Sequence, residues 1–492
     1  MRYLLSIDQG TTGTRALIVD IKGRLAAQAY TEFPQYFPRP GWVEHDPQEI
    51  WNSTRTVIRQ ALLKGRVRPQ TIAGIGITNQ RETTVLWSRQ SGKPLGRAIV
   101  WQCRRSAGIV TSLKARGAEP LFRRKTGLVL DAYFSATKIR WALDHWGGAA
   151  RSSRRRDLVF GTIDSWLIWK LSGGKAHVTD PTNASRTLLY NIYRREWDSD
   201  LCKILRIPKS CLARVLPSAG VFAKTGNVRE LCPGIPITGV AGDQQASLFG
   251  HGCVRTGEMK NTYGTGCFIL LNTGSHALKP RAGLLTTLAC GPQGEPAYCL
   301  EGSIFMTGAV IQWLRDALGL IQKASDSEKI ARSVKDTGGV YLVPAFSGLG
   351  SPHWNMSARG ALLGLTRGSD RGVVVRAALE AIAYQTRDCL ERMRMSIRGR
   401  IRRLRVDGGA ARNNWLMQFQ SDVLGIPVER ARSAQVTALG AAALAAIGAG
   451  VWKNGEPIKG LTGCDALFVP HMRANERERL YSGWKLALGR VL

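Results

Sequence analysis

Two short turns rich in glycine and threonine are the parts of this sequence whose residue types and spacing could hold a phosphate group. The first runs from Asp8 to Thr14 and reads Asp-Gln-Gly-Thr-Thr-Gly-Thr, and the second, from Asn261 to Gly266, reads Asn-Thr-Tyr-Gly-Thr-Gly. Backbone N–H groups and hydroxyls with little side-chain bulk let an anion come close to the main chain. Asp8 has the oxygen ligands that Mg²⁺ prefers, and the guanidinium of Arg15 suits a phosphate oxygen.

One such turn alone would predict only a hairpin, but this sequence adds further groups of the same kind. An acidic residue, Asp243, precedes a helical pattern, and a third glycine turn follows at Asp407-Gly408-Gly409. The common phosphate-binding motifs do not occur: the sequence has no P-loop, no kinase H-R-D loop and no clean G-x-G-x-x-G after a strand. The three turns and the two acidic residues therefore carry the prediction of a phosphate site.

The elements that must position these turns indicate an α/β fold. Apolar segments run into each turn and out again, over Tyr3 to Val19 and over Lys260 to Asn272. The two units lie roughly half the chain apart, which suggests a duplication with two similar domains, 1–248 and 249–492. Chance similarity between two Gly/Thr turns is the alternative explanation.

Three helices can be expected from spacing and capping. Trp51 to Leu63 has apolar residues at helical spacing after Asp46-Pro47, which suit an N-cap and a first-turn proline. Val373 to Met395 is a longer amphipathic pattern. Ser433 to Trp452 is uncharged but rich in alanine and glycine, so it predicts a tightly packed buried helix rather than a membrane span.

The most unusual feature of the composition is its charge. The 492 residues are 44% hydrophobic and 21% charged, which is typical of a globular protein and excludes wholesale disorder, and the formal net charge is +33. Such a surplus raises the possibility of a polyanionic partner. The two basic clusters, Arg151 to Arg156 and Arg392 to Arg405, lack the interleaved aromatic residues that stack bases, so solvated surfaces are the favoured interpretation.

Cysteine spacing and the first residues predict a cytoplasmic location. None of the ten cysteines forms a C-x-x-C pair, so we expect reduced thiols and no zinc site. The apolar run Tyr3 to Ile7 meets Asp8 too early for a secretory signal.

Several longer runs make a more specific resemblance. They are Gly41-Trp42-Val43-Glu44-His45-Asp46-Pro47, Gly76-Ile77-Thr78-Asn79-Gln80-Arg81-Glu82-Thr83-Thr84, Val100-Trp101-Gln102-Cys103-Arg104-Arg105 and Gly242-Asp243-Gln244-Gln245, together with the three turns. With them the sequence resembles the glycerol kinases of the FGGY carbohydrate-kinase family from about residue 3 to about residue 485. The resemblance implies two ribonuclease-H-like domains, as in actin and hexokinase, with a cleft between them, and phosphorylation of glycerol by ATP.

The resemblance also implies roles for individual residues. The polyol site would comprise Arg81, Glu82, Tyr133, Asp243 and Gln244, with Trp101 and Phe268 as apolar walls. Arg81 can only donate hydrogen bonds, Glu82 can only accept them and Gln244 can do both, which suits the hydroxyls of a triol. Asp243 would be the general base, assisted by Asp8 and Arg81, and Asp8 and Asp243 would lie near Mg²⁺.

The nucleotide half of the site would be built around the glycine turns. It would comprise Thr11, Thr12, Gly13, Arg15, Thr265, Gly308, Gln312, Gly409 and Asn413. Thr265 would approach the γ-phosphate of ATP, while Gly409 and Asn413 would flank the adenosine.

The sequence departs from the family pattern in places that bear on the site and its regulation. Asp131-Ala132-Tyr133 stands where D-P-Y is common, and without proline we expect Tyr133 to be less preorganised. Val228 to Pro236 lacks the glycine and arginine arrangement of the fructose-bisphosphate inhibitor loop, and the surroundings of Glu476 diverge from a phosphotransferase-regulator contact. We expect neither form of regulation.

Two alternatives remain beside a glycerol kinase. One is a kinase for another small polyol or ketose, against which Arg81, Glu82 and Trp101 argue. The other is a basic nucleic-acid-binding scaffold with an actin-like shell, which the charge motivates and the retained Asp8, Glu82 and Asp243 oppose. The expected partners are glycerol and MgATP, with no specific nucleic acid, no membrane span and possible assembly into a dimer or tetramer.

Overall fold

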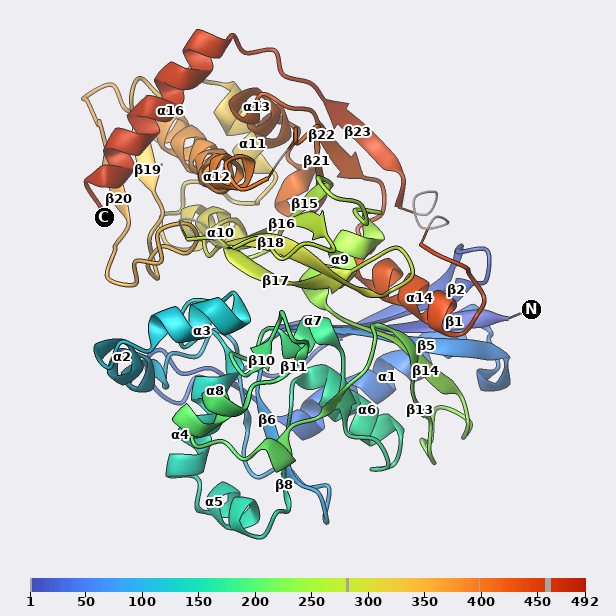
Figure 1. Cartoon of the computed structure of the whole chain (residues 1–492). Helices are drawn as coiled ribbons and strands as arrows, with labels where there is room; N and C mark the ends of the chain where they lie inside the picture. Colours follow the sequence, from blue (N-terminus) through green and yellow to red (C-terminus); the bar gives the residue numbers. More distant parts are fainter. Residues whose placement is uncertain (1, 280–282, 398, 456–461) are drawn as a thin grey trace.

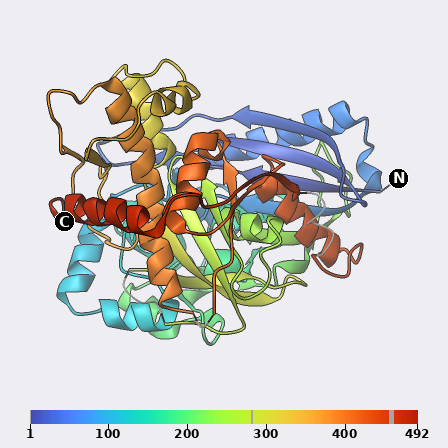
Figure 2. The ribbon, with the colours of Figure 1, turned by 90° about the horizontal axis from the view of Figure 1, so that it is seen from above.

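Each half of the chain builds one large mixed β-sheet, and the two bodies meet face to face (Figure 1). This computed structural model describes residues 2–279, 283–397, 399–455 and 462–492. We call the body around the first sheet the first domain and the body around the second sheet the second domain. Figure 2 gives the same arrangement from above, with the C-terminal helix α16 (Ala474–Gly489) crossing the second domain.

The first sheet has six strands in the order β13-β14-β5-β1-β2-β3. Their bounds are β1 (Tyr3–Gln9), β2 (Gly13–Asp20), β3 (Leu25–Glu32), β5 (Ile72–Asn79), β13 (Ala219–Lys224) and β14 (Pro236–Gly242). β1, β2 and β3 form an antiparallel meander, and β5 and β14 run parallel to β1.

The second sheet has seven strands in the order β17-β18-β16-β15-β21-β22-β23. Their bounds are β15 (Met259–Tyr263), β16 (Cys267–Gly274), β17 (Leu285–Cys290), β18 (Pro296–Ile304), β21 (Leu404–Gly408), β22 (Val428–Ala431) and β23 (Cys464–Phe468). β15, β16 and β18 are antiparallel neighbours, and β21 and β22 run parallel to β15.

The two sheets thus repeat one plan, in which an antiparallel three-strand meander is extended on one side by two parallel strands. The β1–β2 hairpin and the β15–β16 hairpin occupy equivalent places, and these hairpins contain the two Gly/Thr turns. The predicted α/β class with two ribonuclease-H-like domains is confirmed.

The expected helices form close to their predicted positions. α1 (Pro47–Gly65) begins after Asp46, whose carboxylate accepts a hydrogen bond from the N–H of Gln48. α12 (Arg371–Arg394) begins after Asp370, whose carboxylate accepts from the N–H of Val373. Short polar side chains at these positions satisfy the first free N–H groups of each helix.

The alanine-rich segment forms α14 (Val436–Gly448), which is buried as predicted but packs against the sheet of the first domain. It crosses β14, β5 and β1 closely because two glycines in those strands have no side chain. A Cβ built on Gly76 would lie 2.2 Å from the carbonyl oxygen of Ala441, and one on Gly239 would lie 2.3 Å from the amide nitrogen of Ala445. The low side-chain volume on both surfaces therefore sets the helix–sheet distance.

The remaining elements cover the sheets or form smaller lobes. In the first domain they are β4 (Glu44–His45), β6 (Val85–Ser88), β7 (Ala98–Ile99), α2 (Ala107–Ala115), α3 (Glu119–Thr126), α4 (Ser135–His145), α5 (Gly147–Arg154), β8 (Leu158–Gly161), α6 (Ile163–Leu171), β9 (Val178–Thr179), α7 (Pro181–Ala184), β10 (Tyr190–Asn191), β11 (Glu196–Trp197), α8 (Ser199–Ile204) and β12 (Arg214–Val215). α9 (Asp243–Gly250) follows β14 and contacts strands of both sheets. In the second domain they are α10 (Gly308–Asp316), α11 (Asp326–Arg332), β19 (Tyr341–Val343), β20 (Ala361–Leu363) and α13 (Asn414–Leu424).

The cysteines and the apolar helices agree with two further expectations. All ten cysteines are free. Among the helices in the described ranges, none is both long and apolar enough to cross a bilayer.

Candidate active site

Two cavities meet at the glycine turn after β15. The smaller has a volume of about 170 Å³ and is lined by Thr11, Arg81, Glu82, Trp101, Tyr133, Asp243, Gln244, Thr262, Gly264, Thr265, Gly266 and Phe268. The larger, of about 430 Å³, is lined by residues of the second domain that include Gly308, Gln312, Gly409 and Asn413. Gly264 and Thr265 line both. The smaller cavity thus contains the whole predicted polyol set, and the larger contains five of the predicted nucleotide residues when Thr265 is counted.

The carboxylate of Asp243 is held at the first residue of α9, directly after β14. Its two oxygens accept hydrogen bonds from the backbone N–H and the side-chain amide of Gln244, at 2.7 and 3.1 Å. Arg81 Nε lies 3.3 Å from Asp243 Oδ1, and the Asp243 side chain is 29% exposed. Burial raises the pKa of Asp243, while the charges of Arg81 and Lys260 act against that rise. The group is oriented, partly open to the cavity and suited to accept a proton.

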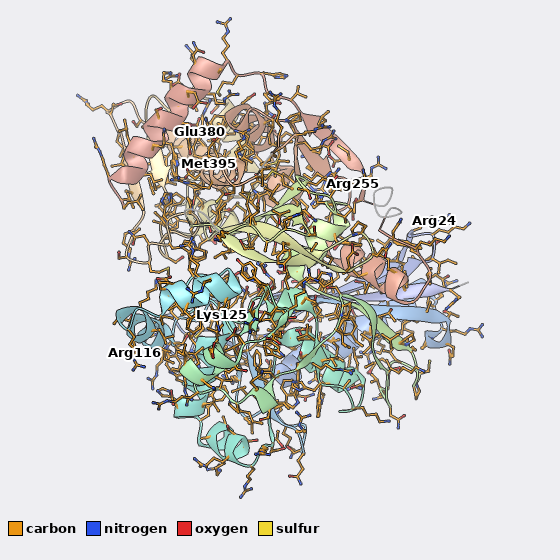
Figure 3. The ribbon with its side chains drawn as sticks, viewed as in Figure 1. Arg24, Arg116, Lys125, Arg255, Glu380 and Met395 are labelled. Atoms are coloured by element: carbon orange, nitrogen blue, oxygen red, sulfur yellow. The ribbon has the colours of Figure 1, made fainter. Side chains whose placement is uncertain are left out.

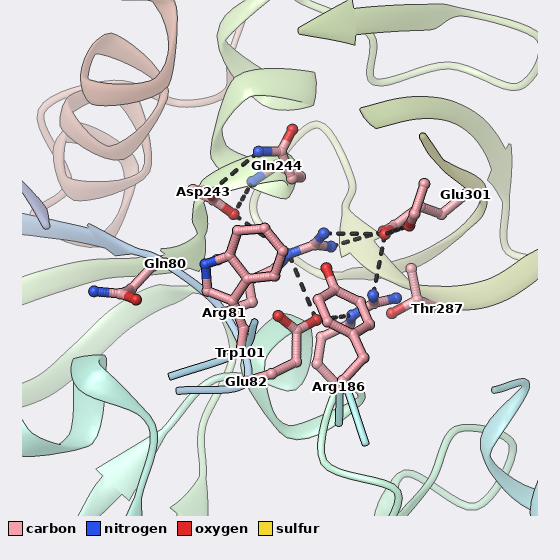
Figure 4. Close-up of polar contacts among 12 residues, drawn as sticks. Gln80, Arg81, Glu82, Trp101, Arg186, Asp243, Gln244, Thr287 and Glu301 are labelled. Atoms are coloured by element: carbon pink, nitrogen blue, oxygen red, sulfur yellow. Dashed lines mark hydrogen bonds and ion pairs between the residues drawn. The ribbon is translucent and has the colours of Figure 1, made fainter. Parts of the chain in front are cut away.

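Below Asp243, two arginines and two glutamates form a buried network (Figure 4). Arg81 binds both oxygens of Glu301 through Nη1 and Nη2, at 2.7 and 3.0 Å. Arg186 Nε donates to Glu82 Oε1 at 2.6 Å, and Arg186 Nη2 lies 3.0 Å from Glu301 Oε1. Burial alone would raise the pKa of Glu301, but Arg186 and Arg81 hold it at about 2. For Glu82, burial outweighs the same two arginines and raises the pKa.

Glu82 also has an unusual backbone conformation. Its φ is +61°, in the left-handed region that residues with a side chain seldom occupy. Its carbonyl accepts hydrogen bonds from Ser135 Oγ at 3.0 Å and Thr84 Oγ1 at 3.1 Å. Strain of this kind is typical of functional sites, and here it turns the side chain of Glu82 toward the arginines.

Aromatic rings form part of the wall of the smaller cavity. The ring of Trp101 meets Tyr133 edge to face with centroids 5.6 Å apart, and Phe268 at 6.3 Å. Trp101 Nε1 donates to Thr11 Oγ1 at 3.0 Å, so the wall is tied to the first glycine turn. The guanidinium of Arg81 lies over Phe268, 5.6 Å from its centroid. The lining of the cavity therefore combines aromatic rings with charged side chains that pack against them.

The loop that carries Tyr133 is firmly held although it lacks the family's proline. Asp131 Oδ1 accepts from the N–H of Tyr133 at 2.8 Å, and Lys138 Nζ donates to the carbonyls of Ala132 and Phe134 at 2.7 and 3.2 Å. Tyr133 is 3% exposed. Side-chain bonds thus supply a restraint on this loop where proline would restrict φ.

Asp8 lies at the end of β1, where it is paired in register with Arg15 of β2. Arg15 Nη1 is 3.9 Å from Asp8 Oδ2. Burial raises the pKa of Asp8 to about 6 against the lowering effect of Arg15, and the negative charge of Asp243 adds to the rise. Asp8 and Asp243 are therefore close enough to influence each other.

A buried lysine that the sequence did not single out supports this site. Lys260, on β15, donates to Gln244 Oε1 at 2.6 Å and to Thr262 Oγ1 at 2.8 Å. Burial lowers its pKa to about 8, while Asp407 and Asp243 oppose the shift. Since the Gln244 amide also donates to Asp243, Gln244 links the lysine to the carboxylate.

Not every predicted nucleotide residue faces the larger cavity. Thr11 lines the smaller one, and Thr12, Gly13 and Arg15 line neither. A Cβ on Gly13 would lie 2.5 Å from the Tyr30 hydroxyl, so this glycine is required by packing inside the first sheet. The roles of these residues toward nucleotide stay predictions.

The main site residues that the sequence did not reveal are Arg186, Glu301 and Lys260. Arg186 and Glu301 are fully buried, yet neither stands in a glycine turn or in a run that signals chemistry. The available signal was chemical: if Arg81 and Glu82 are both buried, the donors and acceptors that they do not offer each other need polar partners from elsewhere in the chain.

Asp8 and Asp243 fit a magnesium ion better than any softer metal. Their carboxylate oxygens are hard ligands, and each raises the energy of the other's negative charge. Among the described residues, no group of three or more His, Cys, Asp or Glu side chains gathers as an all-protein metal cage. Two carboxylates with the remaining positions left to phosphate and water is the usual pattern for Mg²⁺ in phosphoryl-transfer sites.

Comparisons with known proteins agree with this geometry. Residues 3–250 match the N-terminal domain of the FGGY family of carbohydrate kinases, and residues 259–449 match its C-terminal domain. The chain belongs to the FGGY family of carbohydrate kinases. FGGY relatives include glycerol kinase 2 of Thermotoga maritima, 52% identical over 100% of this chain and 99% of that protein, and the glycerol kinase of Petrotoga mobilis, 55% identical over 100% and 98%.

Solved FGGY kinases have the same fold. A crystal structure of Plasmodium falciparum glycerol kinase with ADP superposes with a TM-score of 0.92, at 36% identity, over 100% of this chain and 98% of that one. A ligand-bound xylulose kinase of Lactobacillus acidophilus superposes with a TM-score of 0.87 at 22% identity, and the match covers 98% of this chain and 96% of that one. The second likeness shows the common two-domain fold alone.

Proposed function

We propose that this FGGY kinase transfers the γ-phosphoryl group of ATP to glycerol and forms sn-glycerol 3-phosphate, the entry step of glycerol catabolism. The observation that carries the proposal is the junction of the two cavities at Gly264 and Thr265, with Asp243 on the wall of the smaller one. The names of the full-length relatives at 52% and 55% identity support glycerol as the substrate.

The smaller cavity suits a three-carbon polyol. Its volume of about 170 Å³ is less than half that of the larger cavity, at about 430 Å³. Arg81, Glu82 and Gln244 present donors and acceptors, and Trp101, Tyr133 and Phe268 pack against the carbon chain. The aromatic wall excludes water, which disfavours hydrolysis of ATP.

The transfer follows from the position of Asp243. Its carboxylate accepts the proton of the terminal hydroxyl as that oxygen forms a bond to the γ-phosphorus. The bond from the γ-phosphorus to the β,γ-bridging oxygen breaks, and ADP leaves. A positioned general base contributes on the order of 10²–10⁴ in rate, and positioning with charge neutralisation supplies most of the remainder.

Asp8 and Asp243 would hold Mg²⁺ beside the phosphates, where the ion neutralises negative charge. The nucleotide would occupy the larger cavity, with Thr265 toward the γ-phosphate and Gly409 and Asn413 beside the adenosine. A cytoplasmic location, assembly into a dimer or tetramer, and the absence of specific nucleic-acid binding are further parts of this proposal.

A coupled ADP-release assay across glycerol, dihydroxyacetone and several pentuloses tests the proposal. We expect ATP turnover that depends on glycerol and is much weaker with the five-carbon sugars. Preference for a ketose would replace glycerol with the second candidate substrate class. Folded protein that phosphorylates none of these compounds would contradict kinase function at this site.

A further inference from the structure

A separate cavity of about 830 Å³ lies on the second domain and is surrounded by arginines. Its lining includes Arg255, Arg400, Arg402, Arg403 and Arg405, with Glu258 as the only acidic residue in the described lining. Four of these arginines belong to the basic run 392–405, in which residue 398 lies outside the described residues. Solvation was the favoured interpretation of that run, but the structure gathers its C-terminal part around a concave surface.

The arginine cavity lies at the N-terminal ends of β15 and β21, and the active site lies at their C-terminal ends. Residues 255–258 precede β15, and residues 400–403 precede β21, which runs parallel to β15. The glycine turns of the active site follow the same two strands. At about 3.3 Å per residue, five-residue strands separate the two places by roughly 15 Å. Figure 3 shows Arg255 at this outer flank of the second domain.

The charges around the cavity are only partly compensated. Arg405 lies 3.4 Å from Glu429 and 3.7 Å from Glu258, and Arg403 also pairs with Glu429. Arg400 and Arg402 are exposed, and neither forms an ion pair within the part of the chain that the structure describes. Arg400, Arg402, Arg403 and Arg405 therefore outnumber Glu258 and Glu429, the two carboxylates that the described residues place against them, and the cavity carries a positive field.

The chemistry of this lining selects for phosphate. Guanidinium groups bind phosphate oxygens through paired N–H donors, and several converging on one cavity favour an anion with closely spaced charges. Among the described residues that line this cavity, none has an aromatic side chain on which a nucleobase could stack. We propose that this arginine cavity binds a small anion that carries two or more linked phosphate groups, at a site distinct from the nucleotide cavity.

A long nucleic acid fits this surface less well. Binding of a duplex normally uses positive charge spread along an extended surface. Here the arginines converge on one hollow, and the other basic cluster, 151–156, lies at α5 on the far side of the first domain (Figure 1). The two clusters therefore lie on different domains.

Titration calorimetry with sodium tripolyphosphate tests the proposal. The full-length protein is used near physiological salt, without magnesium, and with saturating glycerol. We compare the double variant Arg400→Ala/Arg402→Ala with Arg154→Ala/Arg155→Ala, which removes the same charge from exposed positions on the first domain. Because the first variant removes two guanidinium groups that would donate charge-assisted hydrogen bonds to phosphate, it should bind at least about tenfold more weakly. The second should stay within about twofold of wild type.

Four results would overturn the proposal. They are the absence of tripolyphosphate binding by wild type, unchanged binding by Arg400→Ala/Arg402→Ala, equal weakening in both double variants, and tighter binding of a short DNA duplex that depends on the same arginines. The third would indicate attraction by the overall field, and the fourth a nucleic-acid surface. If the double variant does not fold, the single variant Arg402→Gln provides the same comparison.

Discussion

Arg81 of the first domain and Glu301 of the second form a buried two-point ion pair, with nitrogen–oxygen distances of 2.7 and 3.0 Å. Arg81 also lies 3.3 Å from Asp243, so the contact that joins the domains also positions the proposed general base. The domain arrangement and the geometry of the reaction site are therefore linked through one guanidinium group.

The variant Glu301→Gln tests this link. It leaves Arg81 and Arg186 facing one buried carboxylate, Glu82, and removing one partner of a buried pair costs about 3–5 kcal/mol. We expect a clear drop in the free energy of unfolding, measured by urea denaturation, together with reduced kcat. Glu196→Gln is the control, since the Arg194–Glu196 pair is exposed and 3.8 Å apart. Equal stability of both variants would show that Glu301 is not required.

Asp243→Asn tests the general base. The amide retains the shape of the carboxylate but cannot accept the hydroxyl proton in the same way, so kcat should fall about 10²–10⁴-fold. Binding of ADP, measured by calorimetry, should change much less because the larger cavity does not include Asp243. Asp316→Asn removes an exposed carboxylate of the second domain and should leave kcat unchanged. A kcat for Asp243→Asn close to wild type would rule out this role.

Lys260→Met tests how a buried positive charge acts on Asp243. Lys260 lowers the pKa of Asp243, so its removal should raise that pKa further. A base with a higher pKa stays protonated up to higher pH, and the acid limb of the kcat/KM profile should move to higher pH. Lys260→Arg keeps the positive charge, so the acid limb of its kcat/KM profile should lie at the same pH as in wild type. A loss of activity without movement of the limb would indicate a purely structural role for Lys260.

Asp164 gives a prediction for stability against pH. Burial and the nearby charge of Asp180 raise its pKa to about 7, although hydroxyls of Thr162 and Thr179 lower it. The folded protein retains this proton when the unfolded chain has lost it, so the contribution to stability is lost as pH rises from about 4 to about 7. Asp164→Asn should therefore raise Tm relative to wild type more at pH 8 than at pH 5. An equal shift at both values would contradict the assignment.

Gly76→Ala tests the close contact of α14 with the first sheet. The added Cβ would lie 2.2 Å from the Ala441 carbonyl oxygen, which forces the helix or strand to move. Overpacking of this kind typically costs about 1–3 kcal/mol, so thermal unfolding should begin at a lower temperature. Gly148→Ala is the control, because its Cβ would contact nothing within 4 Å.

The sequence predicted the parts of this protein that follow local rules. The two glycine turns, the Asp46 cap and the alanine-rich helix depend on neighbouring residues, and the structure forms each of them. Arg186 and Glu301 could not be found in this way, because Glu301 meets Arg81 only after 220 residues of intervening chain have folded. The left-handed backbone of Glu82 likewise depends on Ser135, which is distant in sequence.

The arginine run is a second case in which contacts between residues distant in sequence could not be predicted from the sequence. From composition and spacing, residues 392–405 were predicted to form a solvated surface, because nothing within the run indicates which residues lie beside it in the fold. Only the parallel pairing of β15 with β21 brings Arg255 beside Arg400 and Arg402.

The placement of α14 also affects how the protein is made. The helix that covers β1, β5 and β14 comes from residues 436–448, nearly two hundred residues after β14 leaves the ribosome. During synthesis, the face of the first sheet that contains Gly76 and Gly239 therefore lacks its covering helix until almost the whole chain has been translated. The first domain therefore cannot reach its final packing until residues 436–448 have been translated.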